Sequence, residues 1–141
     1  MAYTVYSFNT SHVDTGMFGV YSAVDPKRAL ETTKLILKEI TRLKNERVDS
    51  AELQGAIEYT KGSLLLASEN SDNHMVRNAQ NEIHFNRDIP LQKVIEQIES
   101  VTVDDIVELS RSLFKQNKMV LTLLGSIKEK KPFEDLLHPD A

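Results

Sequence analysis

The stretch HMVRNAQNEIHFNRDIP, residues 74–90, gathers histidine, arginine and glutamate side chains that could hold a metal ion or grip a substrate. Zinc is the first chemistry to test, because imidazole and carboxylate groups are zinc ligands. His74 and His84 are ten residues apart, whereas two ligands on one helix need about one turn between them. Neither His-Glu-x-x-His nor its inverse His-x-x-Glu-His occurs, so the sequence predicts no metal ligand and no catalytic residue here.

Arg77 and His84 remain as the candidate substrate-binding residues. They are seven residues apart, so both project from one face of a predicted helix. Arginine offers five donors in a fixed geometry and imidazole one donor and one acceptor, which suits a backbone carbonyl or a terminal carboxylate. The same pattern also fits a solvated helix face, with Arg77 pairing with Asn73 or Asn81 and His84 half-buried.

Composition excludes several classes of protein. The 141 residues, 40% of them apolar, suit a single domain over residues 1–141. With 17 basic and 21 acidic side chains and no block of one sign, a nucleic-acid or anionic-membrane surface is not expected. No apolar run has the length of a membrane span and no signal peptide is visible, so we expect a soluble chain, cytoplasmic or periplasmic.

Catalytic signatures other than zinc are also missing. The sequence has no cysteine, no Gly-x-Ser-x-Gly elbow and no phosphate-binding loop. An independent enzyme built from scattered histidine and carboxylate side chains is therefore the least favoured hypothesis.

Alternating patterns at the start of the chain predict a β-hairpin. Residues 2–8 and 17–24 are rich in aromatic and β-branched side chains, and residues 9–16 between them supply turn formers. A third strand is predicted for the short apolar run MVLTLLG, residues 119–125.

A period near 3.6 predicts helices over most of the remaining chain. They are expected over residues 26–47, 49–69 and 72–86, from residue 90 onward, around 106–113, and for a turn or two in the tail. In the 72–86 helix the apolar stripe Met75, Val76, Ala79 and Ile83 is expected to face inward, opposite or beside Arg77 and His84.

This order predicts an α+β fold, a small antiparallel sheet with several helices packed on one face. Sheets usually have about four to six strands, so a three-stranded sheet should leave an open edge. We therefore expect the edge to take another strand or a partner chain, and a homo-oligomer is one such arrangement.

Short stretches along the chain occur in a specific order: ELQGA, KGSLLLASE, NEIHFNR, IESVT with DDI, and the closing MVLTLLG. Together they resemble the C-terminal, non-catalytic domain of the insulinase, pitrilysin and mitochondrial-processing-peptidase family of zinc metallopeptidases. NEIHFNR stands where the family has an Asn/Gln-Glu-Leu-Tyr-Phe-Gly-Arg pattern, and the hairpin resembles the segment that precedes it. The resemblance extends over about residues 2–126.

Family members are longer and close two similar halves around a peptide, with the inverted zinc motif in the N-terminal half. The resemblance therefore implies a C-terminal domain fragment, with zinc in the parent protein and no cofactor on this chain. In the family an arginine and a tyrosine seven residues apart hold the substrate backbone. Arg77 matches the arginine, and His84 replaces the tyrosine with a shorter side chain that can charge near neutral pH.

The leading prediction is a non-catalytic, substrate-enclosing part of a zinc metalloendopeptidase. It would hold a peptide or unfolded polypeptide, through Arg77 and His84, against a zinc site on an absent N-terminal half. This chain alone is predicted to be inactive. The alternative is a catalytically inactive structural or assembly module of the same fold, which the histidine at position 84 favours.

Overall fold

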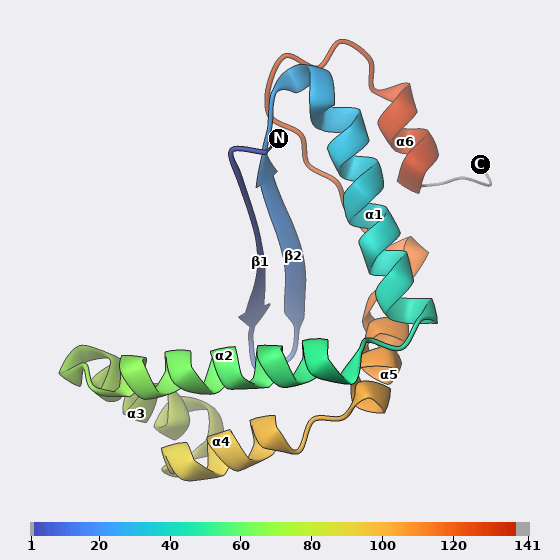
Figure 1. Ribbon diagram of the computed structural model, residues 1–141. Helices are drawn as coiled ribbons and strands as arrows, with labels where there is room; N and C mark the ends of the chain where they lie inside the picture. Colours follow the sequence, from blue (N-terminus) through green and yellow to red (C-terminus); the bar gives the residue numbers. More distant parts are fainter. Residues whose placement is uncertain (1, 138–141) are drawn as a thin grey trace. The chain divides into compact units, whose positions relative to one another are not determined.

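The computed structural model describes residues 2–137, and the predicted α+β fold is confirmed (Figure 1). The elements are β1 (Thr4–Ser11), β2 (Gly16–Ala23), η1 (Pro26–Arg28), α1 (Ala29–Asn45), α2 (Ser50–Ser68), α3 (Ser71–Phe85), α4 (Leu91–Glu99), α5 (Val103–Leu113), η2 (Gln116–Lys118) and α6 (Lys131–Leu137). They form two compact units: unit 1 contains residues up to 46 and from 108 onward, and unit 2 contains residues 47–107. The single domain over residues 1–141 stays a prediction.

The hairpin of unit 1 forms as predicted. β1 and β2 pair antiparallel, from Thr4 opposite Ala23 to Ser11 opposite Gly16. Both strands lie closer to the turn than predicted, since β1 begins at Thr4 and continues to Ser11, and β2 begins at Gly16 and ends at Ala23. The His12 amide closes the turn by donating to the Thr15 carbonyl at 2.8 Å. Neither strand contains a charged residue.

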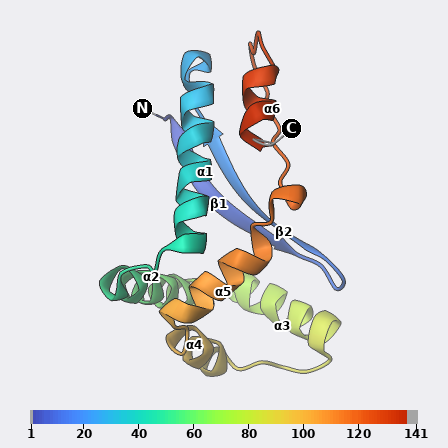
Figure 2. The same ribbon diagram turned by 90° about the vertical axis from the view of Figure 1, so that its right-hand side faces the viewer.

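One face of the hairpin is turned toward α1, which crosses it at an angle near the strand ends away from the turn (Figures 1 and 2). Val5 and Val20 line a cavity of about 520 Å³ together with Ile36 and Ile40 of α1. The inward stripe of α1 has helical spacing, and its members are buried or half-buried: Leu30, Thr33, Leu37, Ile40 and Leu43. The face that carries Val5 and Val20 is turned toward α1 but is not fully covered, since Val5 is 56% exposed, and the opposite face is called the open face below.

The open face of the hairpin is aromatic. Tyr6 stacks on Tyr21 directly opposite, with ring centroids 5.0 Å apart, and lies 6.2 Å from Phe8. Phe8 lies over Gly19, where an added Cβ would come within 2.4 Å of the ring. Only glycine leaves room for Phe8 in this position, so the pair fixes where the aromatic ring lies.

The third strand predicted over residues 119–125 does not form, and in the described part of the chain the sheet has two strands. Val120 is 89% exposed and Leu124 102% exposed. A strand needs a neighbouring strand to take up its amide and carbonyl groups, and none lies beside this run among residues 2–137. The apolar composition of this run favours a strand, but it does not indicate which other strand would pair with it.

Unit 2 is built on α2, which contacts both α3 and α4. Asp49 caps α2 by accepting from the Ala51 amide at 3.0 Å. Ile57 of α2 and Ile95 of α4 are the buried apolar residues of this unit in the described chain. The half-buried residues Leu91, Val94 and Ile98 lie beside Ile95 on the inward face of α4.

The predicted inward face of α3 is wrong. Met75 is 64% exposed and Ile83 75% exposed, whereas Asn81 on the other side of the helix is buried. The Asn81 amide reaches the Ile89 carbonyl at 3.5 Å, which gives the buried polar side chain a partner. The apolar stripe of Met75, Val76, Ala79 and Ile83, called the α3 stripe below, lacks a covering element within unit 2.

Thr102 and Asp105 form a reciprocal cap at the start of α5. The Asp105 carboxylate accepts from the Thr102 amide at 2.8 Å and from its hydroxyl at 2.6 Å, while the Asp105 amide donates to that hydroxyl at 3.2 Å. These bonds to Thr102 lower the pKa of the Asp105 carboxyl from its ordinary value of 3.8.

This cap predicts an acid-sensitive start of α5. Because the folded pKa of Asp105 is lowered, its contribution to stability is complete above pH 3.8 and is lost as the pH falls through the folded pKa. Thr102→Val should move the Asp105 pKa back up, as measured by carboxyl ¹³C shifts during an acid titration. Ser100→Ala removes a nearby hydroxyl that bonds Gln97 instead and should leave the pKa unchanged. An unchanged titration in Thr102→Val would contradict the cap.

Candidate peptide-binding site

Arg77 lies in the middle of α3 and is half-buried. Its Nε atom is buried, and within the described chain it has no hydrogen-bond partner. Neither of the two partners expected for a solvated arginine accepts from this Nε atom, and their side-chain amides donate to backbone carbonyls, Asn73 to that of Ala67 at 3.1 Å and Asn81 to that of Ile89. A buried donor without an acceptor is costly, so a ligand carbonyl or carboxylate would satisfy it only after the side chain moves into reach of the ligand.

His84 lies two turns further along α3 and is exposed, with its ring 6.2 Å from that of Phe85. An α-helix rises about 1.5 Å per residue, so the two side chains leave the helix about 10 Å apart, on the same side. That spacing is close to three residues of an extended peptide. Arg77 and His84 thus lie on one side of α3 as predicted, but Arg77 is half-buried whereas His84 is exposed. Whether they bind substrate stays a prediction.

Local signals at both ends of α3 fix its position in the chain. Asn70 caps the start by accepting from the Asp72 amide at 2.8 Å. Asn86 ends the helix in the left-handed conformation, with φ 51°, which asparagine tolerates better than most residues. Arg77 and His84 therefore lie on a helix with defined limits.

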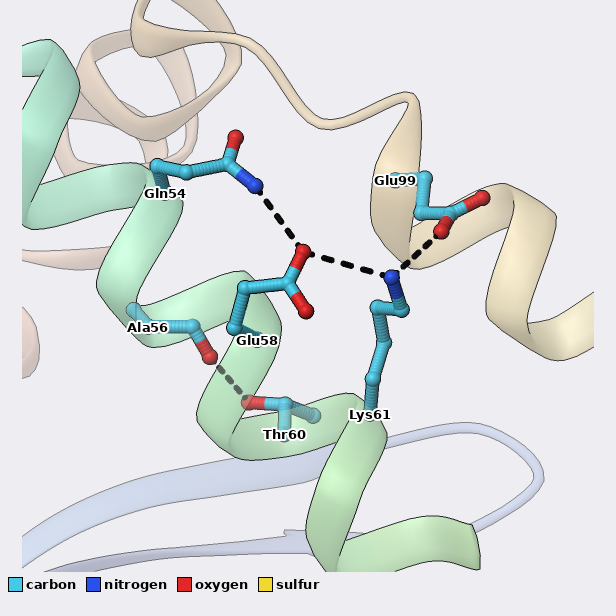
Figure 3. Close-up of polar contacts among 6 residues, drawn as sticks. All are labelled: Gln54, Ala56, Glu58, Thr60, Lys61 and Glu99. Atoms are coloured by element: carbon cyan, nitrogen blue, oxygen red, sulfur yellow. Dashed lines mark hydrogen bonds and ion pairs between the residues drawn. The ribbon is translucent and has the colours of Figure 1, made fainter.

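A network of charged and polar side chains links α2 to α4 (Figure 3). α2 is also the helix that contacts α3. Lys61 of α2 contacts Glu99 of α4 at 2.6 Å and Glu58 at 3.3 Å, and Gln54 donates to the same Glu58 oxygen at 3.0 Å. The hydrogen bond to Glu99 raises the pKa of Lys61 most, and the bond to Glu58 raises it further. The spacing of Glu58 and Lys61 was readable in the sequence, but Glu99 is too distant along the chain for any local pattern to indicate it.

The residues present do not fit a zinc site. Among residues 2–137, no three histidine, cysteine or acidic side chains come together in a way that could hold a metal ion. None of the helices described has both the length and the apolarity to cross a membrane.

The chain exposes much more surface than packed domains do. Its accessible surface is 11142 Å². Two separate compact domains of the sizes of unit 1 and unit 2 would expose about 8,900 Å².

Comparisons with known proteins give the family. Residues 1–59 match the model of the peptidase M16 inactive domain. An uncharacterized zinc protease of Bacillus subtilis is 30% identical over 83% of this chain. One from Streptomyces coelicolor is 26% identical over 92%, and the β subunit of the mitochondrial-processing peptidase of Saccharomyces cerevisiae is 26% identical over 89%.

The chain is a relative of the M16 peptidases. The resemblance to the inactive C-terminal domain of this zinc-peptidase family is thereby confirmed. The M16-type chain spans 28 to 29% of the length of these three relatives. What the relatives do as whole proteins is therefore considered only as a proposal.

Proposed function

We propose that this M16-type chain is the non-catalytic, substrate-enclosing part of a zinc-dependent metalloendopeptidase. In this proposal Arg77 and His84 hold an extended peptide or unfolded polypeptide. The zinc ion, the attacking water and the general base lie on an N-terminal half of the parent protein, which is the chain's main partner. The role of this chain is binding and enclosure, which orient the peptide and exclude water from the reaction.

The observation that carries the proposal is the buried, unpartnered Nε atom of Arg77. An arginine fork that lacks an acceptor in the free chain can give its donors to a peptide carbonyl at no cost to an existing bond. The name of the matched family model, an inactive domain, and the zinc proteases among the relatives agree with a binding role beside a catalytic part.

The proposal is tested by translating the coding DNA upstream of this chain in frame and assaying the complete product. We expect His-x-x-Glu-His with a further glutamate downstream, and peptide cleavage that a zinc chelator abolishes. An upstream domain without that motif, or a complete product that does not cleave peptides, would overturn the peptidase assignment.

The α3 stripe favours a second candidate, a catalytically inactive assembly module. Met75 and Ile83 are large, apolar and exposed, as residues of a subunit interface are before assembly. This candidate requires that charged substitutions in the stripe, such as Ile83→Glu, disrupt a complex while Arg77→Ala leaves function intact. The leading proposal requires the opposite for Arg77.

A further inference from the structure

The cavity between the hairpin and α1, called the α1 cavity below, is lined entirely by residues of unit 1. The hairpin supplies one wall with Val5, Phe18 and Val20. Phe114, just after α5, also lines the cavity, and its ring meets that of Phe18 edge to face at a centroid distance of 5.3 Å. With a volume of about 520 Å³ and mainly apolar walls, the α1 cavity has the size and lining of a small-molecule site.

The remaining wall is a stripe along α1 and the residue before it. Its members have the spacing of one helix face: Arg28, Glu31, Leu35, Ile36, Glu39 and Leu43. The two charged residues at the start of the stripe are followed by mainly apolar ones, and Leu35 is 54% exposed. The α1 cavity therefore has a charged end and an apolar length that is partly in contact with water.

The charged residues of the stripe differ in whether they have partners. The Glu39 carboxylate pairs with the Arg42 guanidinium at 3.2 Å. The side chains of Arg28 and Glu31 have neither a hydrogen bond nor an ion pair within residues 2–137. Three residues apart on a helix, their Cβ atoms are about 5–6 Å from each other. A free cation and a free anion thus lie side by side at one end of the cavity.

We infer that the α1 cavity binds a single-chain zwitterionic amphiphile, such as a lysophospholipid with an ethanolamine or choline headgroup. The phosphate of the ligand accepts from the Arg28 guanidinium, and its ammonium group lies beside the Glu31 carboxylate. The alkyl chain lies between α1 and the hairpin, where its burial supplies most of the affinity.

A zwitterionic head is the one that matches both free charges. A fatty acid would bring its carboxylate beside Glu31, and an alkylammonium ion would bring its charge beside Arg28, so a like-charge contact opposes binding of either. An apolar ligand without a head would use neither residue. Arg77 belongs to unit 2, so the inference does not depend on the proposed function.

Binding of dodecylphosphocholine to the 141-residue chain, below the micelle concentration, tests the inference. Calorimetry measures the affinity and stoichiometry, and methyl NMR locates the ligand. We expect one molecule per chain and methyl shifts at Val20 and Ile36, but none at Ile83, which is exposed in unit 2. Shortening the alkyl chain by two methylene groups should weaken binding about 15-fold, because each buried methylene contributes about fourfold.

Variants test the charged end. Arg28→Gln should weaken binding of dodecylphosphocholine about fivefold, the upper range for an exposed ion pair. Lys27→Gln removes a neighbouring charge that does not line the cavity and should have no effect. Glu31→Gln should raise the affinity for dodecanoate, because the like-charge contact is gone.

Four results would overturn the inference. One is the absence of binding. Another is binding of several molecules with equal shifts at Ile36 and Ile83, which would show that amphiphiles coat any exposed apolar side chain. The third is equal affinity for dodecylphosphocholine, dodecanoate and dodecyltrimethylammonium. The fourth is shifts at Val20 and Ile36 that grow with protein concentration without amphiphile, which would assign the cavity to a second copy.

Discussion

Arg77→Ala should lower kcat/KM for peptide cleavage by the complete polypeptide about 100-fold, because misplacing a substrate that is held opposite the reacting groups costs this much. The variant removes a half-buried guanidinium whose Nε atom has no partner in the described chain, so no internal hydrogen bond is broken. Steady-state kinetics with an unstructured peptide would measure the effect. Most of the loss should appear in KM if Arg77 only binds, and in kcat if it aligns the scissile bond.

Two further variants make the Arg77 result specific. Arg87→Ala removes an exposed arginine just beyond the end of α3 and should leave both constants unchanged. Arg77→Lys keeps the charge but loses the fork of donors, so activity should be only partly retained. Equal cleavage by the Arg77→Ala and unaltered proteins would reject the substrate-holding role and leave the assembly module as the better explanation.

Ile57→Ala should lower the free energy of unfolding by about 3 kcal/mol, because large-to-small substitutions in a core lose transfer energy and leave a cavity. Ile57 is 8% exposed and lies on the helix that contacts both α3 and α4. Urea denaturation followed by circular dichroism would measure the change. It should appear as a lower midpoint with an unchanged slope.

The matched control lies on the same helix. Leu66 is 71% exposed, so Leu66→Ala should change the free energy of unfolding by less than about 0.5 kcal/mol. A loss as large as that of Ile57→Ala would show that Leu66 is covered in solution. Such a result would contradict the exposed surface described here and point to association.

Local patterns predicted the elements well, because each carries its own signals. The charge-free alternation of the hairpin, the Asp49 cap and the apolar stripe of α1 are all present in the structure. Helix limits followed from Asn70 and Asn86, whose side-chain and backbone preferences act within a few residues.

Features that depend on distant partners could not be predicted. The α3 stripe has a helical period, but the period does not say which side of the helix finds a neighbour. Asn81 became the buried residue because the Ile89 carbonyl is within reach. For the same reason the contact between Lys61 and Glu99 has no signature in the sequence.

The candidate site was predicted in part. The seven-residue spacing predicted that Arg77 and His84 lie on one side of a helix, and the resemblance to a family supplied their expected role. The unpartnered Nε atom of Arg77 is a property of the packing and could not be read from residue types. The α1 cavity is also a property of the packing, because the hairpin, α1 and Phe114 line it together.

The bare apolar run at residues 119–124 affects the fate of the chain in a cell. Side chains such as Val120 and Leu124, held almost wholly in water, are what chaperones and quality-control proteases recognise. A copy in which another segment or chain covers these side chains would escape that recognition. The lifetime of the chain in a cell should therefore depend on whether this run is covered.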